Sequence, residues 1–322
     1  MRELSGLSLF CSIVFFDKYA GWFIVDKTWS ISISPYKRAF LQQLPLSGWY
    51  KMTISKRDQH FLTYLNEAKT RHPDLIELLA FYEQLSQAQC EFMAEVDKDS
   101  FPASRELNFS RLTEGVPQFT FEELLINRED LLRLSIRVAE IITKHMPQYG
   151  TGGGIAADGV LLKIAQTIFE SRNPVVLSDA PPNTTSLTAG LSLIPYLQRA
   201  CGTILALIPQ DSWERPYCPV CGGKPSFAAL DKESGARSLL CSRCNAEWLF
   251  GRIGCAFCES TEKQLYYPGE DGLYRLYVCD VCKRYLKTID LRQAGRDVYL
   301  PVECIVTVSM DIAAQEKGYR HY

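Results

Sequence analysis

The sequence has little histidine and no signature of the common hydrolytic enzymes. Its 322 residues include only four histidines, and none of them is paired at the spacing of metal ligands. No Ser/His/Asp arrangement, nucleophile elbow or HExxH motif is present. The apolar run at residues 7–16 is too short to span a bilayer. We therefore expect no catalytic residues, no bound organic cofactor and no insertion into a membrane.

An excess of positive charge is also lacking. The formal net charge is −2 and the pI is about 6.2. Residues 215–290 contain eleven Lys and Arg against nine Asp and Glu, and two metal ions held by thiolates would bring this segment to about −2. Nucleic-acid-binding zinc ribbons usually present a basic face. A nucleic-acid partner is therefore the less favoured alternative.

Cysteine, in contrast, is abundant and regularly spaced. Eight of the twelve cysteines form four Cys-x-x-Cys pairs, which are Cys218/Cys221, Cys241/Cys244, Cys255/Cys258 and Cys279/Cys282. The last two pairs repeat the first two at offsets of 37 and 38 residues. Two residues between cysteines allow both sulfurs to bind one metal from a single tight turn, and two such turns supply four thiolates. The spacing predicts two metal sites, each with four cysteine ligands.

Two other interpretations of the pairs remain open. A thioredoxin-like redox pair stands at the start of a helix, whereas each pair here is followed by turn-like or strand-like sequence. A disulfide framework belongs to secreted domains and does not require four two-residue spacings. Metal binding is favoured over both, and either iron or zinc suits four thiolates, one ion in each site.

The residue after each second cysteine often needs a positive φ angle. Gly222 satisfies this need without steric cost, and Asn245 is the next most tolerant residue type. Glu259 and Lys283 occupy the equivalent positions of the second half and are less suitable. We expect the first site to be the better formed. A site closed by four protein thiolates has no open position for a substrate, so zinc there would be catalytically silent, whereas iron could change its redox state.

The chain divides into five expected parts. Residues 1–51 lack a clear period and are interpreted as an extension, either a non-native start or disordered. Residues 52–210 show helical periodicity and predict a mostly α N-terminal domain. Residues 211–252 and 253–290 predict two small rubredoxin-like or zinc-ribbon β modules, and residues 291–322 a C-terminal tail that packs back on the core.

Several local signals support these assignments. Thr120 and Glu123 form a candidate capping box at the head of a second long helix. The runs at 226–230, 264–267 and 273–278 are strand-like, and 298–308 suits either a strand or a helix. Modules of about 35 residues bury too little apolar surface to fold alone, so their metals should supply much of their stability.

Six segments contain the cysteine pairs and the residues that accompany them, and they are Tyr217–Gly222, Cys241–Trp248, Cys255–Glu259, Cys279–Cys282, Tyr285–Lys287 and Glu316–Tyr319. The order and spacing of these segments resemble those of the FdhE family, the accessory factors of formate dehydrogenase assembly. The resemblance extends over about residues 52–322, and it departs at Lys283, where family members often carry glycine.

This resemblance implies a cytoplasmic, non-enzymatic maturation factor with a helical domain and two rubredoxin-like modules. Its expected partner is the catalytic subunit of a formate dehydrogenase, and iron has been associated with the cysteine pairs of the family. Glu247 and Trp248 follow the second pair and are candidate partner-binding residues, although packing between the modules is at least as well supported for Trp248. The alternative function is redox or sulfur handling through the cysteine pairs on a molybdenum or tungsten enzyme.

Overall fold

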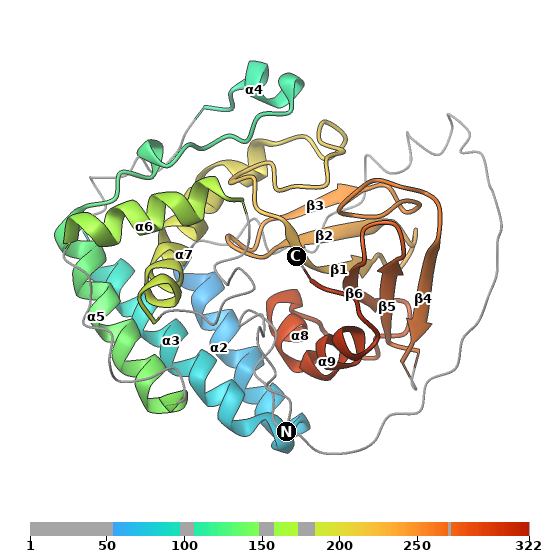
Figure 1. Cartoon of the computed structure of the whole chain (residues 1–322), viewed down its shortest axis with the longest axis horizontal. Helices are drawn as coiled ribbons and strands as arrows, with labels where there is room; N and C mark the ends of the chain where they lie inside the picture. The colour runs from blue at the N-terminus through green and yellow to red at the C-terminus, as the bar shows by residue number, and fades with distance from the viewer. Residues whose placement is uncertain (1–53, 97–105, 148–157, 173–183, 270–271, 322) are drawn as a thin grey trace.

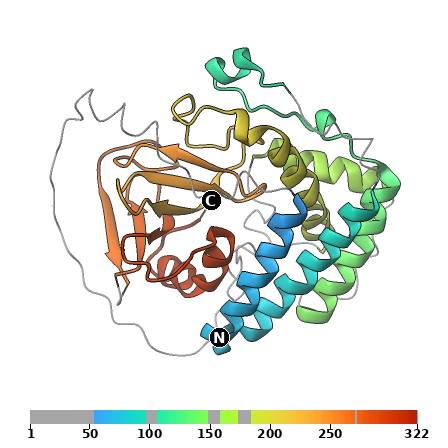
Figure 2. The same ribbon diagram turned by 180° about the vertical axis from the view of Figure 1, so that it is seen from behind.

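The computed structural model describes residues 54–96, 106–147, 158–172, 184–269 and 272–321. The expected extension at residues 1–51 lies outside these ranges. Within them the chain forms a helical part and a sheet part that lie side by side, with two C-terminal helices next to both (Figures 1 and 2). The predicted order of a helical N-terminal region followed by small β modules with two four-cysteine groups is confirmed.

Amphipathic helices build the first part. The helices are α2 (Ile54–Arg71), α3 (Ile76–Glu95), α4 (Phe109–Glu114), α5 (Arg128–His145), α6 (Asp158–Glu170) and α7 (Thr184–Ile204), with short 3-10 helices at Pro73–Leu75, Glu122–Leu124 and Leu205–Leu207. Helix α7 packs against α5 and α6, and α3 packs against α5 and α2. The buried faces of these helices share one hydrophobic core, which extends to the first cysteine pairs. None of the helices in the described ranges is long and apolar enough to cross a membrane.

The start of α5 differs from the prediction. The backbone N–H of Thr120 donates to the Glu123 carboxylate at 2.7 Å, so half of the expected capping box forms. This hydrogen bond lies beside the short 3-10 helix Glu122–Leu124, whose N-cap is Phe121 and has no side-chain capping hydrogen bond. Helix α5 begins later, where Asn127 Oδ1 accepts hydrogen bonds from the N–H groups of Glu129 and Asp130. Asn127 is therefore the N-cap, a role for which Asn is strongly preferred.

The sheet part contains both cysteine modules in one six-stranded sheet. Its strands are β1 (Pro225–Leu230), β2 (Arg237–Cys241), β3 (Glu247–Phe250), β4 (Gln264–Pro268), β5 (Tyr274–Cys279) and β6 (Arg284–Asp290). Each module is an antiparallel three-stranded unit, and the spatial order is β3-β2-β1-β6-β5-β4. Parallel pairing of β1 with β6 joins the two units. The repeat in the sequence is therefore a repeat along one continuous sheet.

The C-terminal residues form helices α8 (Leu300–Val306) and α9 (Val308–Glu316). Of the two structures that suit 298–308, the helix is the one observed. Helix α8 contacts α2 and β1, and α9 contacts β6, so the tail connects the helical part with the centre of the sheet (Figure 1). A buried ion pair fixes α9, because Lys287 of β6 lies 2.6 Å from Asp311 and both side chains are fully buried.

Candidate metal centres

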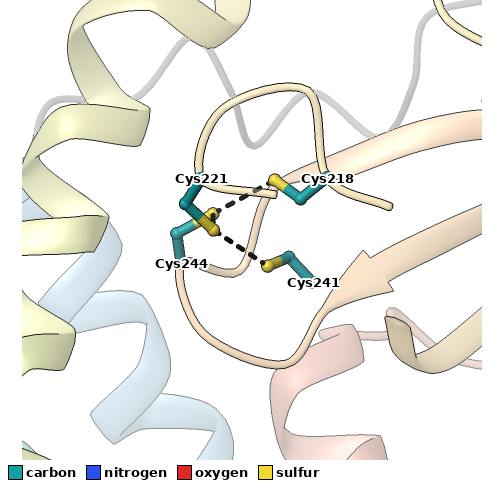
Figure 3. A group of neighbouring side chains, drawn as sticks. All are labelled: Cys218, Cys221, Cys241 and Cys244. Carbon is teal, nitrogen blue, oxygen red and sulfur yellow. Dashed lines mark hydrogen bonds between the residues drawn. The ribbon is translucent and has the colours of Figure 1, made fainter. Parts of the chain in front are cut away.

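The structure brings the first two cysteine pairs together. We call Cys218, Cys221, Cys241 and Cys244 the first cysteine group; their side chains converge from two facing turns (Figure 3). The Sγ atoms of Cys218 and Cys244 lie 3.5 Å apart, as do those of Cys221 and Cys241. A tetrahedral ion with metal–sulfur bonds of about 2.3 Å separates its sulfur ligands by about 3.8 Å. The group therefore fits zinc or iron after a small increase in the distances between its sulfur atoms.

The last two pairs form the second cysteine group, which consists of Cys255, Cys258, Cys279 and Cys282. The sulfurs of Cys255 and Cys282 are 3.6 Å apart, and those of Cys258 and Cys279 are 3.7 Å apart. These separations are again close to tetrahedral coordination by four thiolates. All eight cysteines of the sequence prediction are thus grouped as expected, and their roles as ligands remain a prediction.

The turns around the sulfurs have the backbone geometry that such sites require. In the first group the N–H of Val220 points at Cys218 Sγ and that of Arg243 at Cys241 Sγ, both at 3.4 Å. The residue after each second cysteine has a positive φ angle, which is 71° at Gly222 and 57° at Asn245. The same backbone conformation recurs in the second group at Glu259 and Lys283, with φ of 59° and 56°. The sequence identified these four positions correctly.

The two groups differ in their burial. Cys218, Cys241 and Cys244 have no exposed surface and Cys221 is 3% exposed. In the second group Cys255 and Cys279 are buried, whereas Cys282 is half-buried and Cys258 is exposed. The first group thus lies inside the molecule, and the second lies at its surface.

The helical part closes the first group. Backbone N–H groups of Gln118 and Phe119 donate to the carbonyls of Pro219 and Val220, at 2.9 and 3.0 Å, so a loop of the helical part pairs with the first cysteine turn. The buried side chain of Arg243 reaches the end of α6, where Nη1 donates to the Phe169 carbonyl at 3.0 Å. The first group is therefore a junction between the helical and sheet parts.

Burial also controls the acidity of these thiols. Desolvation, with hydrogen bonds from neighbouring thiols, raises the pKa values of Cys218 and Cys244. Hydrogen bonds from the other three thiols, with a further contribution from the Arg243 charge, lower the pKa of Cys221. Four buried thiolates need a compensating cation, and a divalent metal ion supplies it.

Two residues near the first group were not identified from sequence. Arg243 is a positive charge beside the thiols, but it lies between two cysteines and gives no separate sequence signal. Cys201 of α7 has no second cysteine at two-residue spacing in the sequence, yet its thiol borders Cys244. Burial is the main cause of the raised pKa of Cys244, and the hydrogen bond with Cys201 raises it further. The sequence does not indicate this contact, because helix α7 and the cysteine turns come together only in the folded chain.

The side chain of Trp248 lies inside the molecule. Its side chain is only 4% exposed, belongs to the main hydrophobic core and donates from Nε1 to the Arg215 carbonyl at 2.9 Å. The neighbouring Glu247 is half-buried. Trp248 therefore packs within the molecule, and a role of Trp248 or Glu247 in binding a partner stays a prediction.

Comparisons with known proteins agree with this architecture. Residues 217–252 match the family model described as "FdhE, central domain". The chain is 27% identical over 273 residues to the "Protein FdhE homolog" of Aquifex aeolicus, a match that covers 82% of this chain and 93% of the relative. It is 29% identical over 161 residues to "Protein FdhE" of Escherichia coli K12, covering 48% and 50% of the two chains.

A solved structure shows the same fold. The crystal structure of the FdhE protein from Pseudomonas aeruginosa superposes with a TM-score of 0.51 at 20% sequence identity, covering 86% of this chain and 94% of that one. Together with the sequence matches, this similarity confirms the resemblance to the FdhE family that the cysteine spacing indicated.

Proposed function

Because the resemblance to the FdhE family is confirmed, we propose that this protein is an accessory factor in the maturation of a formate dehydrogenase. It binds the catalytic subunit of that enzyme in the cytoplasm, is required for the enzyme's activity and is not itself an enzyme. Each cysteine group holds one iron or zinc ion. The similarity to an FdhE homologue over 93% of that relative's length supports the proposal.

The geometry of the cysteine groups supports a structural role for at least one metal. A closed set of four thiolates has no position at which a substrate could bind a metal. The first cysteine group is closed and fully buried, and it lies where the helical part meets the sheet. A metal there holds the two parts in one arrangement, so that a surface composed of both can be presented to a partner.

The proposal is tested by co-expressing the chain with a formate dehydrogenase catalytic subunit in a host without its own FdhE protein. We expect the two proteins to co-purify, and we expect formate oxidation to depend on the accessory chain. Cys241→Ser should lose both effects together with one equivalent of metal. Cys90→Ser, which removes a thiol outside both groups, is the matched control and should retain them.

Two results would contradict the proposal. Formate dehydrogenase of full activity without the chain would remove the maturation role. Full activation by a folded, metal-free Cys241→Ser protein would remove the metal from the function.

A second function is favoured by one observation. Redox or sulfur handling by the cysteine pairs requires a thiol that solvent can reach, and Cys258 is exposed. Sulfur transfer predicts a persulfide on the protein as purified, whereas a maturation factor without thiol chemistry predicts eight unmodified cysteines that all bind metal. Mass spectrometry of the anaerobically purified chain distinguishes the two.

A further inference from the structure

We propose that the two cysteine groups have different chemical roles: the first retains its metal, and the second is an exchange site that gives up metal and reacts with solutes through Cys258. This proposal rests on metal binding by both groups, which is part of the proposed function. Two independent features of the structure carry it. One is the access of solvent to the sulfurs, and the other is the backbone conformation of the turns.

Solvent access to the sulfurs differs between the two groups, because the rest of the chain covers the first group on all sides and the second group only in part. Its four cysteines are at most 3% exposed, under the loop at Gln118 and Phe119 and under the Arg243 side chain. A cavity of about 130 Å³ between the helical part and α8 is lined in part by Cys244, but Cys244 itself has no exposed surface. The rest of the chain therefore shields the sulfurs of the first group from solutes.

The second group lacks such a cover on one side. Cys258 is exposed, and the residues beside the ligands, Ile253 and Val281, are 59% and 51% exposed. Ligand exchange at a thiolate site begins when an incoming donor approaches the metal and one sulfur leaves. At the second group, Cys258 is the ligand that can leave into water without moving another element.

Backbone conformation also favours easier loss of metal from the second group than from the first. The turns of the second group hold Glu259 and Lys283 at positive φ angles, where the first group has Gly222 and Asn245. A left-handed conformation is unfavourable for residues with a long side chain, whereas Gly adopts it freely and Asn is more tolerant. Loss of the metal allows the turns of the second group to leave the left-handed conformation. Part of the free energy of metal binding at this group therefore offsets the cost of that conformation. The first group has less strain to release.

Neither metal exchange nor alkylation at Cys258 requires another reactant from the protein. In metal exchange, a chelator donor would take the place of Cys258 on a bound ion, and the released Cys258 thiolate would take a proton from water. In alkylation, Cys258 sulfur forms a bond to carbon and the halide leaves. Both reactions leave the oxidation state of the metal unchanged.

The first test measures metal release from the full-length protein loaded with zinc. Metal content is determined first, because fewer than two ions per chain contradicts the proposed function and not the difference between the groups. A chromogenic chelator in excess should then remove one equivalent at least tenfold faster than the other. Release of both equivalents at one rate would overturn the proposal.

The second test assigns the fast equivalent to its cysteines. The chain is treated briefly with iodoacetamide during the fast phase, and peptides are mapped by mass spectrometry. We expect label at Cys258 and Cys282 before label at Cys218 or Cys241. Earlier labelling of the first group would overturn the assignment.

A matched pair of substitutions tests the strain. Glu259→Gly should raise the zinc affinity of the second group about fivefold in a chelator competition, because it removes a left-handed non-glycine residue. Asn245→Gly, at the corresponding position of the first group, should leave the affinity of the more weakly bound zinc ion unchanged. An unchanged affinity in Glu259→Gly, with metal content and fold intact, would show that strain does not weaken the second group.

Discussion

The residue after the first cysteine pair illustrates how a single side chain is constrained at a metal turn. Gly222 has a φ angle of 71°, and a Cβ atom there would lie 3.0 Å from Pro117. We expect Gly222→Ala to lower the free energy of unfolding by about 1–2 kcal/mol through the left-handed conformation, with a further cost from the contact. Urea unfolding of the zinc-loaded chain measures this change. Gly272→Ala, at a left-handed position with open space around it, separates the conformational cost from the steric one.

His321 gives a prediction of pH dependence. The ring is buried and stacks on Tyr285, and burial together with the Lys287 charge lowers the pKa of His321 to about 3. An unfolded histidine has a pKa of about 6.5. The folded state therefore binds fewer protons, so its stability is complete above pH 6.5 and is lost as the pH falls toward 3.

Comparison with a neutral variant isolates this contribution. Between pH 7 and pH 5.5 the free energy of unfolding of the wild type should fall by about 1 kcal/mol more than that of His321→Gln, because only the unfolded wild type gains a proton at this position. Urea unfolding at both pH values provides the measurement. Equal losses in the two proteins would mean that His321 is protonated in the folded state or is not buried in solution.

At the scale of elements, the contact between β6 and α9 depends on one buried ion pair. Lys287 donates to Asp311 at 2.6 Å, and the Tyr285 hydroxyl donates to the other oxygen of that carboxylate at 2.8 Å. Asp311→Asn leaves the ammonium buried without its counter-ion, for which we expect a destabilisation of about 3–5 kcal/mol. Thermal unfolding is the measurement. Lys287→Met combined with Asp311→Asn should recover part of the loss, because no unpaired charge remains and Asn still accepts from Tyr285.

Elements specified by local sequence were predicted well. The two-residue spacing within each pair, and the turns it imposes, identified both cysteine groups. Strands β1, β4 and β5 coincide with the strand-like runs, because side chains at adjacent positions determine this preference. The start of α5 was placed too early at Thr120, since the hydrogen bond between the Thr120 N–H and Glu123 forms beside a single 3-10 turn and not at the head of a long helix.

Elements that depend on distant contacts were not predicted. Pairing of β1 with β6 merges two modules that the sequence presents as separate repeats. The same long-range packing buries Trp248 and places Cys201 of α7 beside Cys244. Neither position carries a local pattern that distinguishes a buried side chain from an exposed one, so the surface for a partner could not be located from sequence.

At the scale of the whole molecule, the arrangement of the helical part against the sheet depends on the first cysteine group. The N–H groups of Gln118 and Phe119 donate across the junction to the two residues between Cys218 and Cys221. Metal binding and local folding are coupled at such sites. A chain that loses the first metal should therefore lose these hydrogen bonds, even though Gln118 and Phe119 belong to the helical part.

Hydrogen–deuterium exchange of two matched variants tests this dependence. In Cys221→Ser, the peptide that contains Gln118 and Phe119 should exchange at least tenfold faster than in the wild type, because its acceptors are no longer held. In Cys258→Ser, the same peptide should be unaffected, because its acceptors, the carbonyls of Pro219 and Val220, belong to a turn of the first group. Peptides from α3 and α5 serve as the internal reference for an intact helical core. Equal protection at Gln118 and Phe119 in all three proteins would mean that apolar packing, and not the first metal, holds the two parts together.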